Sequence, residues 1–236
     1  MTENLPGYIS IVFILTTFLT LGFLFRAIRQ TVFDTVSAKL VVFFITFWIF
    51  FQAIFSLGGF YLITDKVPPR LAVFGVVPAI LLIISLFIFA RKSFIEPLPL
   101  KTLTFLSVVR IPVELVIFWL FQNKLMPQIM TFGGWNFDIL SGITAPFIAW
   151  FAFRGSETNR PLLIIWNIFA LALLVIIITI AILSIPSPFQ KLAFDQPNTA
   201  VLYFPFIWLP TIIVPIVLFS HLTSLWILLK ERKTTH

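Results

Sequence analysis

The sequence predicts an all-α integral membrane protein, a single domain over residues 1–236 that forms a seven-transmembrane-helix bundle with its N-terminus outside and its C-terminus in the cytoplasm. Three observations predict this fold. Hydrophobic residues make up 60% of the chain and charged residues only 11%, whereas a soluble domain carries about 25% charged residues. Seven apolar stretches follow one another without the period-two alternation of a membrane β-barrel. The basic residues are shared unevenly between the two sides that these stretches define.

The seven stretches are defined by their apolar composition and by the helix breakers between them. A helix needs about 20 apolar residues to cross the hydrocarbon core of a bilayer. The predicted spans are residues 8–25, 40–63, 71–90, 102–121, 139–153, 161–183 and 207–229. Proline, glycine and charged residues separate them, as in "DKVPPR", "EPLPLK" and "RGSETNRP". The fifth span is short, and an earlier start near Trp135 is an open alternative.

The distribution of basic residues predicts the orientation. Eleven of them fall on one side of the membrane: Arg26, Arg29, Lys39, Arg91, Lys92, Lys101, Arg154, Arg160, Lys230, Arg232 and Lys233. Four fall on the other side: Lys66, Arg70, Lys124 and Lys191. Cytoplasmic loops carry the excess of lysine and arginine. We therefore expect an integral protein of the plasma (inner) membrane with its N-terminus outside.

The composition also excludes several kinds of cofactor and partner. The chain has no cysteine, which excludes disulfides, thiolate metal sites and iron–sulfur clusters. Only one histidine, His221, falls within a span, so bis-histidine haem ligation is excluded too. The net charge of +7 is explained by membrane-flanking loops. We predict no cofactor, no metal site and no nucleic-acid partner, and the lipid bilayer is the expected surrounding.

Two ionisable residues stand inside the fourth span, in "SVVRIPVELVIFWLF". Arg110 and Glu114 are four residues apart and share one helical face, so they can pair within the helix. A charge at the centre of a span costs about 2.5–3.5 kcal/mol even on the lenient insertion scale. We expect both side chains to point into the bundle and to touch each other or a polar group of the seventh span. They are either a structural ion pair or a binding or proton-handling site.

Three further polar residues are candidates for the same site. His221 lies at a similar depth in the seventh span and is either a packing residue or part of a proton relay or anion site. Asn167 in the sixth span is expected to face the interior, more often as an interhelical hydrogen-bond partner than as a ligand. Asp138 opens the fifth span, where the favoured interpretation is a helix N-cap at the wet outer boundary. Alternatively, Asn136 and Asp138 line an entrance above Glu114.

Two other features belong to the fifth and seventh spans. Gly142, Ala145 and Ala149 form a stripe of small residues that predicts close packing of the fifth span against a neighbour. The long, unusually apolar loop 185–206 is either a partial lid over the bundle or a passive interfacial segment.

These residues predict a multi-pass membrane protein with a buried polar site in its fourth and seventh spans, and transporter-like handling of a small molecule or ion. One alternative is a receptor, sensor or assembly partner without transport. A second is a membrane-embedded lipid-modifying enzyme, which is less favoured because no nucleophile–base pair is legible. The ligand, the coupling ion and the oligomeric state are left open by the sequence.

Overall fold

The structure is a computed structural model that describes residues 5–231. Residues 1–4 and 232–236, and with them the predicted cytoplasmic Arg232 and Lys233, lie outside the described residues. All regular structure within residues 5–231 is helical. The α-helices are α1 (Gly7–Thr31), α2 (Val36–Leu57), α3 (Val77–Phe89), α4 (Leu100–Leu106), α5 (Arg110–Gln122), α6 (Ile139–Phe153), α7 (Arg160–Ser184) and α8 (Val214–Glu231).

Six helical segments in the described part of the chain are long and apolar enough to cross a membrane. They overlap six of the predicted spans, with ends that differ by up to six residues: Gly7–Thr31, Val36–Leu57, Ala72–Phe89, Leu100–Gln122, Arg160–Ser184 and Leu209–Lys230. The seventh apolar helix is the shorter α6. It begins at Ile139, as the hydropathy predicts, and the alternative start near Trp135 is wrong because residues 131–138 are not helical.

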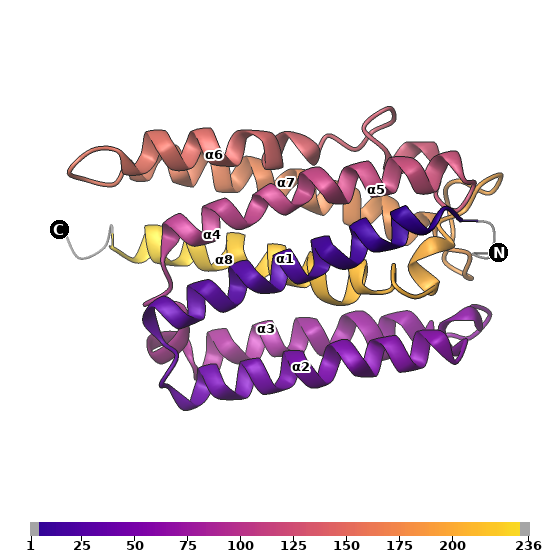
Figure 1. Ribbon diagram of the computed structural model, residues 1–236, viewed down its shortest axis with the longest axis horizontal. Coiled ribbons are helices and arrows are strands. Elements are labelled where there is room, and N and C mark those ends of the chain that lie inside the picture. The colour runs from indigo at the N-terminus through magenta and orange to yellow at the C-terminus, as the bar shows by residue number, and fades with distance from the viewer. Residues whose placement is uncertain (1–4, 232–236) are drawn as a thin grey trace.

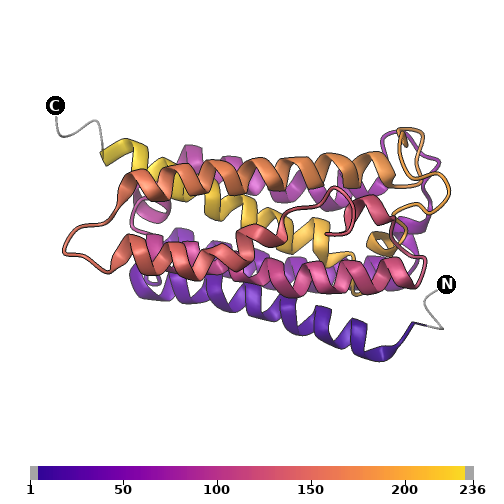
Figure 2. The same ribbon diagram turned by 90° about the horizontal axis from the view of Figure 1, so that it is seen from above.

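The helices run lengthwise through an elongated bundle (Figures 1 and 2). α1 packs on α4 and α5, α6 packs on the same segment, and α7 lies along α8. α2 and α3 form a hairpin at one side of the bundle (Figure 1). Large apolar side chains cover the outside, such as Phe43 and Phe89, which are 72% and 84% exposed. A surface of this kind is stable only against lipid, because it would be an aggregating patch in water.

α6 does not reach the end of the bundle at which α5 stops; it begins part-way along (Figures 1 and 2). Its 15 residues extend about 22 Å, less than the roughly 30 Å of a hydrocarbon core. The turn-rich loop 123–138 covers the missing length. A Cβ at Gly134 would collide with the backbone of Gln128 and Ile129, so only glycine permits this close folding of the loop. Non-helical backbone is tolerated at membrane depth only where protein or a polar cavity surrounds it.

Two prolines inside spans free backbone carbonyls that side chains from other helices then use. Proline lacks an N–H, so it cannot bond to the carbonyl four residues earlier. Before Pro78 the free carbonyl of Phe74 accepts from Gln52 Nε2 at 2.8 Å and from the Tyr61 hydroxyl at 3.3 Å. Gln52 therefore bonds α2 to the irregular turn that precedes α3.

The second proline repeats this arrangement in α8. Pro215 frees the carbonyl of Thr211, and Trp48 Nε1 donates to that oxygen at 3.0 Å. A π-helical turn precedes each of the two helices that contain these prolines, over Ala72–Val76 before α3 and over Leu209–Ile213 before α8. Both irregular turns are thereby bonded to α2, which fixes the hairpin to the rest of the bundle.

The loop 185–206 is hydrogen-bonded to the turn that follows α5. Gln196 Nε2 donates to the carbonyl of Phe121 at 2.9 Å, and the backbone N–H groups of Thr199 and Ala200 donate to that of Leu125 at 3.1 and 3.0 Å. The loop therefore forms a bonded cover at this end of the bundle.

Candidate functional site

Arg110 lies in the middle of the span formed by α4 and α5. It is ten residues beyond Leu100 and twelve before Gln122, which places it about 15 and 18 Å from the two ends. A 3₁₀ turn over Ser107–Val109 separates the two helices. It comes just before Pro112, whose missing N–H leaves the preceding turn free to tighten. The guanidinium is 2% exposed and faces the bundle interior, as the sequence predicts.

Arg110 bonds to three other helices. Its Nη1 donates to Asp138 Oδ1 at 2.7 Å, in an ion pair whose side chains are 3% and 6% exposed. The same nitrogen donates to the carbonyl of Ala170 in α7 at 3.2 Å, and Nη2 lies 3.1 Å from His221 Nε2 in α8. The predicted contact between Arg110 and the seventh span is therefore confirmed.

Of the two expected contacts, the one between Arg110 and Glu114 inside one helix does not form, because the guanidinium pairs with Asp138. The predicted N-cap role of Asp138 is wrong. Asp138 stands at the N-cap position of α6, but its side chain accepts no capping hydrogen bond. It is 5% exposed and lies beside a mid-span arginine, because α6 begins inside the bundle and not at a wet boundary.

His221 is held between Arg110 and Asn167. Asn167 Nδ2 donates to the carbonyl of Leu163 at 2.8 Å, so the Asn167 Oδ1 atom faces His221 Nδ1, also at 2.8 Å. This oxygen accepts a hydrogen bond and therefore selects the neutral imidazole with its proton on Nδ1. Nε2 is then the acceptor for Arg110. A second proton on Nε2 would face the guanidinium N–H, so this geometry opposes the predicted relay role of His221.

Glu114 belongs to the same network through Asn136. Asn136 Nδ2 donates to Glu114 Oε2 at 2.6 Å and to the carbonyl of Met130 at 2.8 Å. Its Oδ1 accepts from the backbone N–H of Asp138 at 3.0 Å. Within residues 5–231 no ion pair involves Glu114, which is 1% exposed. The loop 123–138 thus carries an amide into the bundle to meet a buried carboxyl group.

All five predicted site residues therefore lie in one chain of contacts. The chain runs from Glu114 through Asn136 and Asp138 to Arg110, and on through His221 to Asn167. The sequence indicates Asn136 only as an alternative entrance residue, and the carbonyl of Ala170 carries no sequence signal. A useful signal was the shortness of the fifth span, since a helix that starts late leaves polar loop residues at membrane depth.

Three buried donors beside the ion pair have no hydrogen-bond partner among the described residues. They are the Nε of Arg110 and the hydroxyls of Ser107 and Ser141. Ser107 is one turn before Arg110 on its span, and Ser141 is one turn after Asp138 in α6. Because the two spans run in opposite directions, both hydroxyls lie on the α4 side of the ion pair. A guanidinium flanked by unused donors is suited to bind an anion.

The small-residue stripe brings α6 close to this site. A Cβ at Gly142 would lie 2.9 Å from Ile111 Cγ1 and 3.3 Å from Arg110 Cβ. Ala145 and Ala149, further along the stripe, are both 0% exposed. The predicted close packing of the fifth span is confirmed, and its partner is the Arg110 segment. Over residues 5–231, no three histidine or acidic side chains gather in a way that could hold a metal ion.

Comparison with known proteins identifies a family. The matching family model is described as "Domain of unknown function (DUF8737)" and covers residues 68–229, more than half of the chain. The chain belongs to this family. The DUF8737 region contains every residue of the polar network, whereas α1 and α2 precede it. No curated protein and no solved structure matches the chain.

Proposed function

We propose that this chain is a proton-coupled carrier of small anions, with Arg110 as the anion-binding group. The observation that carries the proposal is the Arg110–Asp138 ion pair in the middle of the span, at the point where α6 begins. Helices that are interrupted beside polar residues at mid-membrane are typical of substrate sites in carriers. An intramembrane charge is by default a candidate functional site.

Charge balance suggests how the site would work. With Glu114 protonated and His221 neutral, the ion pair leaves the network without net charge. An incoming anion that takes the guanidinium would displace the carboxylate of Asp138, which must then gain a proton to remain in a medium of low dielectric constant. Glu114, one helical turn from Arg110 on the same span, would supply that proton and would then regain one from the side on which the anion enters. One proton would thus enter with each monovalent anion.

His221 and Asn167 would position the guanidinium in this scheme. His221 holds Nη2 by accepting its N–H, and Asn167 fixes the tautomer that makes this possible. The unpartnered Nε of Arg110 and the hydroxyls of Ser107 and Ser141 would donate to the bound anion. His221 and Asn167 are thus positioning groups, and Arg110 is the group that touches the substrate.

Uptake into proteoliposomes tests this function. Pyruvate and inorganic phosphate serve as the probe anions, and a pH-sensitive dye trapped inside the proteoliposomes reports proton entry. We expect uptake with proton entry in the wild type, no uptake for Arg110→Gln, and wild-type uptake for the matched surface control Arg154→Gln. Glu114→Gln should fold yet lose proton-driven uptake. Uptake that survives Arg110→Gln would overturn the proposal.

The variant Asp138→Asn makes the test specific to the mechanism. It frees Arg110 from its competing carboxylate while the asparagine amide keeps a similar shape. We expect the probe anion to bind more tightly and to raise the thermal stability further than in the wild type, without proton uptake. A sensor without transport would show the same stabilisation by the anion but no uptake by the wild type.

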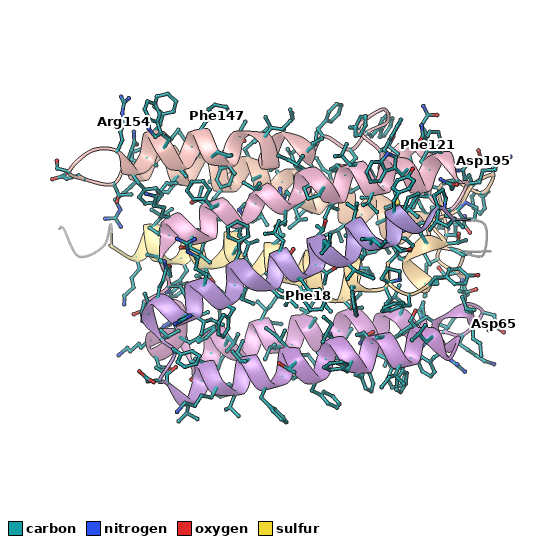
Figure 3. The ribbon with its side chains drawn as sticks, viewed as in Figure 1. Phe18, Asp65, Phe121, Phe147, Arg154 and Asp195 are labelled. Carbon is teal, nitrogen blue, oxygen red and sulfur yellow. The ribbon has the colours of Figure 1, made fainter. Side chains whose placement is uncertain are left out.

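We further propose seven spans, with α6 as the fifth, the N-terminus outside and the plasma (inner) membrane as the location. The asymmetry of basic residues and the positions of α1 and α8, which begin and end at opposite ends of the bundle, support this topology. Asp65 and Asp195 lie at one end and Arg154 at the other (Figure 3). Single cysteines at Asp65 and Asp195 should react only with an external impermeant reagent, and one at Ser156 only after permeabilisation. External labelling at Ser156 would exclude seven spans.

A further inference from the structure

An apolar groove of about 270 Å³ lies between α1 and α2, away from the polar network. Leu24, Ile28 and Ile49 form its buried base, while Phe18 and Phe50 are exposed at 55% and 64%. Figure 3 shows Phe18 in the space between α1 and α2. Trp208 lines the groove as well. Its Nε1 already donates to the carbonyl of Ile49, so the indole contributes only its apolar ring surface to the groove.

Two basic residues continue the groove beyond its apolar lining. On α1 the lining residues Phe18 and Phe25 precede Arg29 by eleven and four residues, which is the spacing of one helical face. On α2 the lining residues Val42 and Thr46 follow Lys39 by three and seven residues, again on one face. Arg29 and Lys39 therefore stand on the groove faces of the two helices, at the end where α1 stops and α2 starts.

Both cations are available to a ligand. Arg29 and Lys39 are exposed, and neither is ion-paired within residues 5–231. The turn between the helices contributes one carboxylate, Asp34, against these two charges and that of Arg26 nearby. The mouth of the groove thus has a net positive charge, whereas its lining within the membrane is apolar.

The dimensions of the groove match one leaflet of a bilayer. From Phe18 to Ile28 the groove follows α1 for ten residues, or about 15 Å, which is half of the roughly 30 Å hydrocarbon core. The groove therefore has the length and the apolar lining that one acyl chain of the adjacent leaflet needs, and its mouth adds the positive charge that an anionic headgroup needs.

We propose that this groove is a binding site for an anionic phospholipid of the adjacent leaflet. One acyl chain lies between α1 and α2 with its end at Trp208, and the phosphate-bearing headgroup is held by Arg29 and Lys39. Most of the lining precedes residue 68, where the family match begins. Apart from Trp208, the site therefore lies outside the part of the chain that the family model matches. It is independent of the proposed transport function.

Native mass spectrometry of the purified protein tests the proposal with two probes of identical chains, dioleoylphosphatidylglycerol and dioleoylphosphatidylcholine. Each basic residue strengthens the binding of an anionic lipid by about fivefold, so two residues predict a preference of about 25-fold for phosphatidylglycerol. Arg29→Gln with Lys39→Gln should abolish the preference. Arg29→Lys with Lys39→Arg should keep it, and so should the distant control Arg154→Gln.

The apolar part of the site is tested by filling it. Thr46 lines the groove and is exposed, so Thr46→Trp should weaken binding of both lipids while the protein stays folded. Phosphatidylglycerol with brominated chains should quench the fluorescence of the wild type more than that of Trp208→Phe. Equal affinity of the wild type for both lipids, or a preference that survives loss of both charges, would overturn the proposal. A dimer that Thr46→Trp disrupts would overturn it too, because a second copy would then occupy the groove.

Discussion

Removal of either partner of the Arg110–Asp138 ion pair should destabilise the protein far more than removal of both. Arg110→Leu leaves the carboxylate of Asp138 buried without a cation and also leaves His221 Nε2 without its donor. Asp138→Leu leaves the guanidinium with the carbonyl of Ala170 and His221 as remaining acceptors. We therefore expect Arg110→Leu to be the more damaging of the two single variants.

The magnitude follows from the burial of the pair. Breaking a buried ion pair by removing one partner costs about 3–5 kcal/mol, whereas replacing both partners with apolar groups is often nearly neutral. Asp138→Leu should fall near the lower value and Arg110→Leu near the upper one. For a protein of this size 1 kcal/mol corresponds to about 2–4 °C in Tm, so the single variants should lose roughly 6–20 °C. The double variant should recover most of that loss.

Thermal unfolding in detergent, followed by intrinsic fluorescence, measures all four proteins of the cycle. Arg154→Leu provides the control for loss of a cation, because Arg154 is exposed and should change Tm by less than about 2 °C. Additive losses in the double variant would show that the two charges are not coupled. Single variants with the wild-type Tm would show that water reaches the pair, and the argument from desolvation would then fail.

Three further outcomes follow from other contacts. Gly142→Ala should lower Tm, because the added methyl meets Ile111 at 2.9 Å and overpacking costs about 1–3 kcal/mol; an unchanged Tm would mean that the helices separate freely. Gln52→Leu should cost about 1–3 kcal/mol in chemical denaturation, because the carbonyl of Phe74 loses its closer donor and the Tyr61 hydroxyl loses the Gln52 Oε1 acceptor; Thr46→Leu is the lipid-facing control. The hydrogen bond and charge of Lys230 lower the pKa of Glu96, so this pair stabilises at neutral pH and its contribution is lost as the pH falls through that lowered pKa. Stability profiles of the wild type and Lys230→Gln should converge in acid, and a constant difference would exclude this linkage.

The spans were predictable because each depends on a local property of the chain. Hydropathy and breakers are read from consecutive residues, and six predicted spans agree with helices long enough to cross a membrane. The burial of Arg110 was equally predictable, because exposure of a charge to lipid is costly wherever the helix lies. The sequence could therefore name the site residues without specifying how they pair.

The pairing was not predictable because it depends on where α6 begins in space. Placed at a wet boundary, Asp138 would be an ordinary N-cap residue. The folded loop 123–138 moves the start of α6 inward, and Asp138 then competes for Arg110 with Glu114, which is nearer in sequence. Gly134 makes this folding possible. Its effect could not be inferred from the residue type alone, since a glycine in a polar loop usually indicates nothing more than a turn.

The network has one arrangement of protons that satisfies all its hydrogen bonds, and this links protonation to conformation. Asn167 and His221 each donate to one neighbour and accept from the other, whereas Arg110 donates to both of its neighbours, through Nη2 to His221 and through Nη1 to the carboxylate of Asp138. A proton added to Asp138 removes the charge that holds Nη1, while a proton added to His221 sets two donors against each other. Either change breaks a contact between α8 or α6 and the Arg110 segment. Because the network joins α5, α6, α7 and α8 at mid-membrane, a change in its proton count must also change how these helices are held together, as the proposed proton-coupled carrier requires.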